Sequence, residues 1–91
     1  MNDEPEPTDP ERLARIERAL ASLTRRTREI FLAYRLDDYS YAKIADITGL
    51  SVSQVERHMT KAIRQLGRYA DGDERTAWQR WRQAHLPRWF G

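Results

Sequence analysis

The chain has 91 residues, of which 16 are Lys or Arg and 14 are Asp or Glu, so its formal net charge is only +2. This length builds one domain with a modest core, which excludes most enzymes with separate cofactor and substrate lobes. Cysteine is absent, which excludes disulfides and thiolate sites and favours a reducing compartment. We find neither a membrane-spanning apolar run nor a signal-peptide pattern, and therefore expect a cytoplasmic protein.

The charges are unevenly distributed along the chain. Residues 1–11 hold five acidic and no basic residues, which leaves nine acidic against sixteen basic residues in the rest. The first ten residues include three prolines and no periodic apolar residue, so we expect residues 1–9 to form a flexible acidic tail. The basic excess after this tail indicates either a solvated, arginine-rich surface or a nucleic-acid partner.

Two helices are expected before residue 37. Asp9 can cap the first helix and Pro10 can take its first position. Thr24 fits the N-cap of the second helix, which runs through TRRTREIFLAYRL. The residues expected to be buried are Leu13, Ile16, Leu20 and Leu23 for the first helix, and Ile30, Phe31 and Tyr34 for the second.

A glycine corner joins the third and fourth helices. Ser40 can cap the helix YAKIADIT, and Gly49 lies where a left-handed residue ends a helix. Ser51 and Gln54 have capping-box spacing, so the fourth helix should begin at Val52. Tyr41, Ile44 and Ala45 share a face of the third helix, and the apolar stripe of the fourth, which we expect to face the core, is Val52, Val55, Met59, Ile63 and Leu66. The free face of the fourth helix carries Ser53, Glu56, Arg57, Thr60, Lys61, Arg64 and Arg68.

A tryptophan-rich segment follows. Residues 71–73 indicate a turn and a cap, and ERTAWQRWRQAHL predicts a fifth helix with Trp78, Trp81 and His85 on one side, ended by Pro87. We find no strand pattern and no repeat, so the predicted class is all-α. The predicted organisation is a tail over 1–9, a helical domain over 10–70 and a Trp/Arg-rich helix and tail over 71–91.

The glycine corner is typical of a helix-turn-helix, whose second helix enters the DNA major groove. Ala45 allows the two helices to approach closely, and Val55 points back into the core. The basic face is left for DNA, because Lys and Arg bind phosphates and Arg, Gln, Ser and Thr also read base edges. The alternative is an αα-corner of another helical domain, with charges that are merely solvated.

The stretches TREIFL, SYAKIA, GLSVSQVERHM and KAIRQL carry a family resemblance. Residues 23–66 resemble region 4 of the sigma-70 family, especially its extracytoplasmic-function (ECF) group, and ERHM is similar to the ferric-citrate-type subgroup. The resemblance implies a winged-helix-like helix-turn-helix domain of about four helices, here with an extra C-terminal helix. It implies recognition of the −35 element of a promoter and docking on the flap of the RNA polymerase β subunit.

The resemblance also assigns roles to residues and partners. The implied base-reading residues are Glu56, Arg57, Thr60 and Lys61 with Gln54 beside them, and the implied phosphate-binding residues are Ser51, Ser53 and Arg64. The implied partners are double-stranded promoter DNA, the polymerase β subunit and, as a further candidate, an anti-sigma factor. No cofactor, metal or membrane is implied.

The chain departs from the family pattern in two ways. A complete ECF factor also has region 2, which nothing in residues 1–22 supplies, so we expect a separated region 4, a fragment or a stand-alone protein. Residues 78–91 lie outside the pattern and predict either a helix that enlarges a small core or a docking segment. The rival functions are a LuxR-type output domain and a decoy module that regulates polymerase or another sigma factor.

We expect neither a catalytic nor a metal site. His58 and His85 have no Cys or carboxylate at ligand spacing, so each is predicted to be an ordinary surface or half-buried histidine. Asp37 and Asp38 lie in a connection between helices and are predicted to cap or solvate a turn. A glycine-rich phosphate loop is also absent from the sequence.

Overall fold

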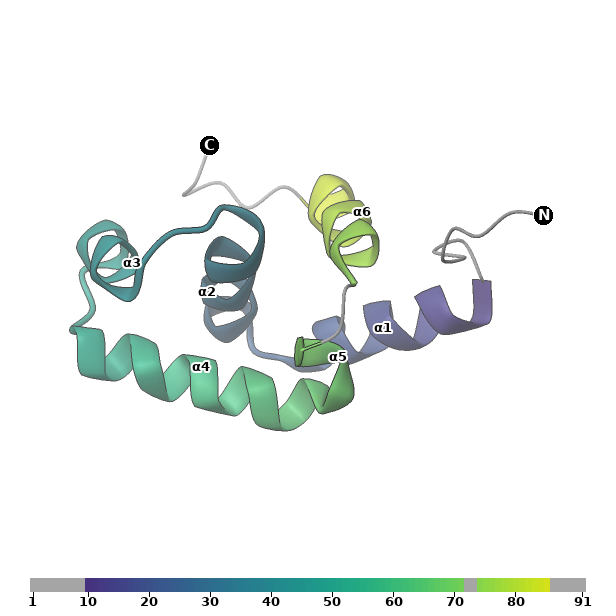
Figure 1. Ribbon diagram of the computed structural model, residues 1–91, viewed down its shortest axis with the longest axis horizontal. Helices are drawn as coiled ribbons and strands as arrows, with labels where there is room; N and C mark the ends of the chain where they lie inside the picture. The colour runs from purple at the N-terminus through teal and green to yellow at the C-terminus, as the bar shows by residue number, and fades with distance from the viewer. Residues whose placement is uncertain (1–9, 72–73, 86–91) are drawn as a thin grey trace.

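The computed structural model describes residues 10–71 and 74–85. Over these ranges the helices, in chain order, are α1 (Pro10–Ser22), α2 (Arg25–Leu36), α3 (Tyr41–Thr48), α4 (Val52–Leu66), α5 (Arg68–Asp71) and α6 (Arg75–His85) (Figure 1). No strand occurs in the described residues, which confirms the all-α class and leaves the helix-turn-helix without a β-wing there. The sequence pattern does not predict the short α5.

The first two helices begin where their caps predict. α1 starts at Pro10, while its predicted cap, Asp9, lies outside the described residues. Thr24 caps α2, because its side chain accepts a hydrogen bond from the backbone N–H of Thr27 at 3.4 Å. The predicted apolar stripe of the first helix is buried throughout: Leu13, Ile16, Leu20 and Leu23.

α2 is the central helix of the fold. It packs against α3, α4 and α6, and α3 and α6 lie on opposite sides of it (Figure 1). Its buried residues are Thr27, Glu29, Ile30, Phe31, Leu32, Ala33 and Leu36. The prediction that Tyr34 is buried is wrong, because Tyr34 lies on the uncovered strip of α2, is 38% exposed and pairs there with the ring of Tyr41.

α6 contributes both of its tryptophans to the core. Trp78 meets Phe31 edge to face, with ring centroids 5.3 Å apart, and both side chains are buried. Trp81 lies between the guanidinium of Arg28, 4.5 Å from the ring centroid, and the stacked ring of His85 at 3.8 Å. This burial favours the core-enlarging role of α6 over a docking role for these two side chains.

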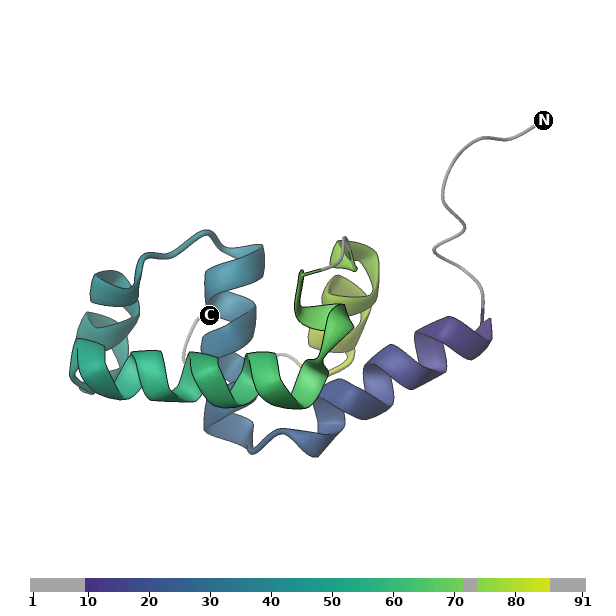
Figure 2. The same cartoon turned by 60° about the horizontal axis from the view of Figure 1, so that its bottom comes forward.

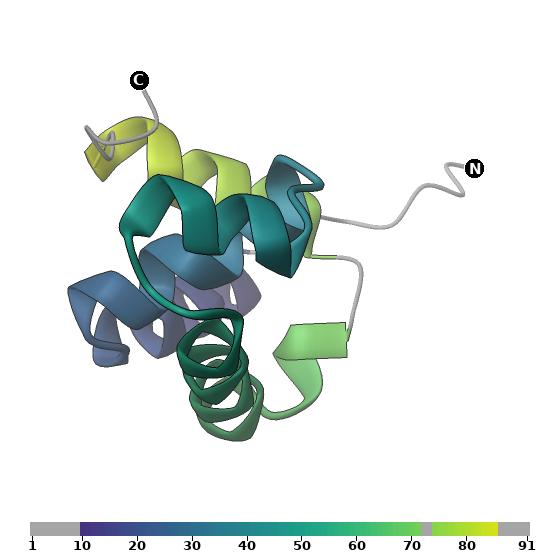
Figure 3. The ribbon, with the colours of Figure 1, turned by 90° about the vertical axis from the view of Figure 1, so that its left-hand side faces the viewer.

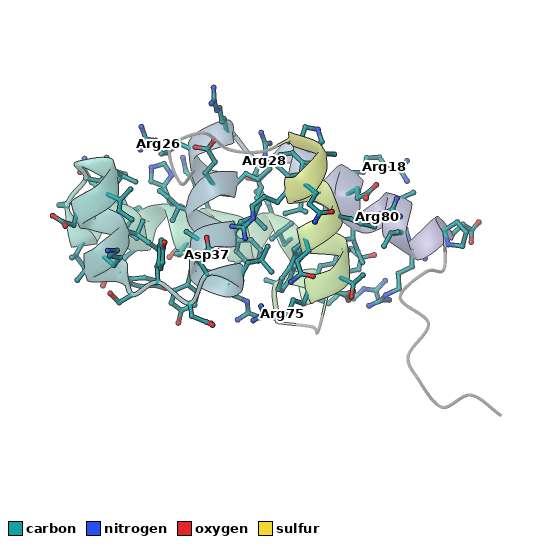
Figure 4. The ribbon with its side chains drawn as sticks, turned by 90° about the horizontal axis from the view of Figure 1, so that it is seen from above. Arg18, Arg26, Arg28, Asp37, Arg75 and Arg80 are labelled. Carbon is teal, nitrogen blue, oxygen red and sulfur yellow. The ribbon has the colours of Figure 1, made fainter. Side chains whose placement is uncertain are left out.

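Polar contacts fasten α6 to the end of α2. Arg75 donates to the carbonyl oxygens of Arg35 at 3.0 Å and Leu36 at 3.5 Å. These carbonyls belong to the last turn of α2, where the helix itself supplies no donors. Arg82 pairs with Asp37, so Asp37 does more than solvate a turn. Figure 4 shows Arg75 and Asp37 where α6 and the C-terminal end of α2 meet.

Candidate nucleic-acid interface

The corner between α3 and α4 forms as the sequence predicts. Ser40 caps α3, its Oγ accepting a hydrogen bond from the Lys43 backbone N–H at 3.0 Å. Gly49 ends the helix with φ +78°, and its N–H donates to the Ala45 carbonyl at 2.9 Å. This left-handed conformation favours glycine. The chain therefore turns sharply and presents α4 at an angle to α3 (Figure 3).

α4 starts with a complete capping box. Ser51 Oγ accepts from the Gln54 backbone N–H at 3.1 Å, and Gln54 Oε1 accepts from the Ser51 backbone N–H at 2.9 Å. Both side chains are exposed. Because these bonds use only acceptor atoms of the side chains, the Ser51 hydroxyl proton and the Gln54 Nε2 amide protons stay free to donate to a ligand.

The buried side of α4 is narrower than predicted. The side chains that face the core are Val55, Met59, Ala62 and Leu66. Val52 is 42% exposed and Ile63 is 44% exposed, so the prediction that they are buried is wrong. At 3.6 residues per turn, both lie at the edge of the stripe formed by the other four, where neighbouring helices no longer cover them.

α4 ends at Leu66, before Arg68, the last residue of its predicted polar face. Gly67 follows Leu66 with φ +58° and ψ −131°, a conformation outside the helical region. Arg68 therefore belongs to α5, and the prediction that it continues the polar face of α4 is wrong. Of the four predicted cations on this face, Arg57, Lys61 and Arg64 remain.

The outer face of α4 is uncovered along its length. α1, α2, α3 and α5 all pack against α4, yet it lies along one edge of the molecule and passes in front of α2 in Figure 2. Every candidate binding residue in this part of the chain is exposed: Ser51, Ser53, Gln54, Glu56, Arg57, Thr60, Lys61 and Arg64. The structure thus brings together one N-cap serine and seven side chains of α4.

The two flanks of this face differ in charge. Glu56 lies toward α3, on the same side as Tyr41. The pKa of the Tyr41 hydroxyl is raised mainly by burial, then by Tyr34 and then by the charge of Glu56. On the flank toward α2, an open hollow of about 180 Å³ is lined by Gln54, Arg57, His58 and Lys61. The positive potential needed to attract phosphates is therefore concentrated at the centre and on the α2 side of the face.

His58 is the residue of this surface that the sequence interpretation misses. Its Nδ1 lies 2.8 Å from Thr27 Oγ1 on α2. Burial lowers the pKa of the imidazole, and the charges of Lys61 and Arg26 lower it further. The spacing of Gln54, His58 and Lys61 at i, i+4 and i+7 could have placed His58 on the same side of α4.

The chemistry available at this surface is ligand binding. It offers guanidinium, ammonium, hydroxyl and amide donors, which suit phosphate oxygens and base edges. Within residues 10–71 and 74–85, no group of three or more His, Asp or Glu side chains could hold a metal ion. In the same ranges, no helix has the length and apolar character needed to cross a membrane.

Comparisons with known proteins match the region that contains this surface. Residues 13–66 match the family described as Sigma-70, region 4, a range that runs from Leu13 in α1 to the end of α4. The chain is also 42% identical over 48 residues to the Positive control factor of Bacillus subtilis (strain 168), which covers 53% of this chain and 28% of that protein. The match thus spans less than a third of the relative's length. No solved structure matches the chain.

Proposed function

The chain belongs to the sigma-70 region 4 family, and from this premise we propose that it is the promoter-binding domain of an ECF sigma factor of the ferric-citrate type. Sigma-70 region 4 is a DNA-binding domain of the transcription machinery and not an enzyme family. In this proposal α4 reads the −35 element, and the domain docks on the β flap of RNA polymerase in the cytoplasm. The ERHM motif within residues 23–66 supports the subgroup.

The uncovered outer face of α4 is the observation that carries the proposal. Its side chains are polar and exposed from Ser53 to Arg64, while the opposite face is fixed in the core by Val55 and Met59. A helix held in this way can enter the major groove without rearrangement of the core. A helix with merely solvated charges would need no one-sided excess of cations.

The proposed roles follow from position on this face. Arg57 and Arg64 lie at its centre, opposite the buried stripe, and Lys61 lies beside them. The proposed base-reading residues are Gln54, Glu56, Arg57, Thr60 and Lys61, and the proposed phosphate-binding residues are Ser51, Ser53 and Arg64. Base reading by Arg57 or Lys61 gives sequence specificity, whereas phosphate contacts give affinity that falls with salt.

Binding to labelled duplexes tests the proposal. Fluorescence anisotropy would compare a duplex selected from a randomised pool with its scrambled version over a salt series. We expect Arg57→Ala and Lys61→Ala each to weaken binding by about 1–3 kcal/mol, and Arg80→Ala, which removes an exposed arginine from α6, to leave it unchanged. Absence of binding in low salt, or equal affinity for all variants, would contradict DNA reading by α4.

A stand-alone regulator that binds polymerase is the second candidate function. The name of the relative, Positive control factor, supports it, since that name describes a regulator. A pull-down with RNA polymerase separates the two candidates. A regulator or decoy that does not read DNA keeps its binding to polymerase when Arg57 and Lys61 are replaced, and it shows no preferred duplex.

We also propose an anti-sigma factor as a candidate partner. The family match gives no support to the LuxR-type alternative.

A further inference from the structure

His58 sits on the flank of α4 that meets α2, beside the uncovered outer face. It lines the open hollow of about 180 Å³ together with Gln54, Arg57 and Lys61, and its side chain is half-buried. Arg26 lies on the side of α2 that faces away from α6 (Figure 4) and is close enough to act on the imidazole. The hollow therefore combines one histidine with two cations of α4, and Arg26 of α2 acts on the same imidazole.

A chain of hydroxyl groups orients the imidazole. Thr24 Oγ1 donates to Thr27 Oγ1 at 3.0 Å, and Thr27 Oγ1 lies 2.8 Å from His58 Nδ1. Because Thr27 accepts the proton of Thr24, its own hydroxyl proton is free to bond to Nδ1 of a neutral imidazole, which then carries its proton on Nε2. Thr27 is only 2% exposed, so water does not compete for this contact.

The second ring nitrogen remains for a ligand. Within the described part of the chain, the structure gives Nε2 of His58 no hydrogen-bond partner. When Nδ1 of the neutral imidazole accepts from Thr27, Nε2 carries the ring proton; in the imidazolium, which donates from Nδ1 to Thr27, both ring nitrogens carry one. Nε2 is thus a hydrogen-bond donor in either state, and protonation adds a charge without reorienting the ring.

The surrounding charges make this site sensitive to an anion. Arg26 on α2 and Lys61 on α4 are the charged groups that act on the imidazole, together with burial, and all three lower its pKa. A phosphate in the hollow would offset the cations and stabilise the imidazolium, because an opposite charge nearby favours the charged form.

We propose that His58 binds a phosphate of the duplex through Nε2 and takes up a proton when DNA binds, so that affinity for DNA rises as the pH falls. This inference rests on the proposed function, since it requires that the outer face of α4 lies on DNA. The proton comes from solvent and resides on the imidazole, while Thr27 acts as a positioning residue. The domain would therefore bind promoters more tightly in an acidified cytoplasm.

The pH dependence of DNA affinity tests the proposal in the full chain. Anisotropy at constant ionic strength should show roughly three- to tenfold tighter binding at pH 6 than at pH 8 for the wild type. His58→Gln keeps a side-chain donor but cannot take up the proton, so its affinity should not change with pH. The matched control is His85→Gln, because His85 is the other histidine of the chain and lies on α6; it should keep the wild-type profile.

NMR titration of the two histidine rings supplies a second measurement. The pKa of His58 should rise when a saturating amount of duplex is added, and Thr27→Val should weaken binding at pH 6 while broadening the His58 signals. A pH-independent affinity of the wild type, or a pH dependence that persists in His58→Gln, would overturn the proposal. Those outcomes leave DNA binding itself intact, whereas failure to bind any duplex at pH 6 or pH 8 would contradict the proposed function instead.

Discussion

Arg82 holds Asp37 through two parallel contacts, Nη1 to Oδ2 at 2.7 Å and Nη2 to Oδ1 at 2.9 Å, across 45 residues of sequence. Asp37 is also the C-cap of α2, where its backbone N–H bonds to Ala33 O at 3.2 Å. The pair therefore joins α6, which lies outside the family match, to the end of the central helix of the matched region. Bidentate pairing of this kind fixes orientation as well as distance.

We expect Arg82→Ala to lower the free energy of unfolding by about 1–2 kcal/mol, because both side chains are largely shielded and the geometry is bidentate. Arg80→Ala is the matched control, since Arg80 meets Glu17 at 3.5 Å and is 61% exposed. It should cost at most about 0.5 kcal/mol. Urea denaturation measures both values, and equal costs would contradict the assigned role of Asp37.

Trp78→Ala should cost about 3–5 kcal/mol, since the indole is buried against Phe31 and its removal leaves a large cavity. Such a loss is a major part of the stability of a small domain. Trp78→Phe should cost less than half as much, because it keeps much of the packing and removes an indole N–H that is buried without a partner among the described residues.

Thermal unfolding followed by circular dichroism distinguishes these variants. A deletion of residues 73–91 removes both tryptophans of α6 and should lower the melting temperature at least as strongly as Trp78→Ala. If the shortened chain melts like the wild type but no longer binds polymerase, the C-terminal segment is a docking element and its core role is refuted.

The two glycines with positive φ, Gly49 and Gly67, should respond differently to alanine. A Cβ at either position meets no heavy atom within 4 Å, so the cost is conformational. Gly49→Ala should cost about 1 kcal/mol, because φ +78° and ψ 7° lie in the left-handed helical region. Gly67→Ala should cost more, about 2–3 kcal/mol, because φ +58° with ψ −131° is a region that side chains rarely enter.

Gly49→Asn provides the check on this explanation. Asparagine tolerates the left-handed helical region better than alanine, so Gly49→Asn should recover part of the loss. Equal melting temperatures for the alanine and asparagine variants would show that the backbone conformation at residue 49 does not set the cost.

The corner of this fold could be predicted from sequence because its signals are local. Caps at Ser40 and Ser51 and the helix end at Gly49 depend on groups within one turn of the chain. The buried stripe of α1 could be predicted for the same reason, since its apolar residues repeat at a regular helical spacing.

Features set by distant neighbours could not be predicted. Val52 and Ile63 have the right spacing for burial, yet both are exposed. The width of the apolar stripe of α4 that is buried depends on where the neighbouring helices end. The contact of Thr27 with His58 joins residues 31 positions apart, so the sequence predicts only an ordinary histidine there. Side-chain contacts of this range depend on how α2 crosses α4, which no periodicity encodes.

The final prediction concerns the stability of the free protein against pH. Folding lowers the pKa of His58 through burial, Lys61 and Arg26, so the unfolded chain binds this proton more readily than the folded chain. Stability should therefore be lost as the pH falls below about 6.5, the ordinary value for histidine, and level off once the folded protein is protonated as well. Above that value His58 is neutral in both the folded and the unfolded state, so it does not make the free energy of unfolding depend on pH.

Urea denaturation between pH 8 and pH 5 measures this loss. His58→Gln should flatten the decline near pH 6, and comparison with His85→Gln separates the two histidines of the chain. With saturating duplex, the stability should instead rise as the pH falls. DNA that favours the imidazolium stabilises the folded protein more strongly at low pH than at high pH. A decline that is identical in the wild type and in His58→Gln would show that protonation of His58 does not cause the loss of stability at low pH.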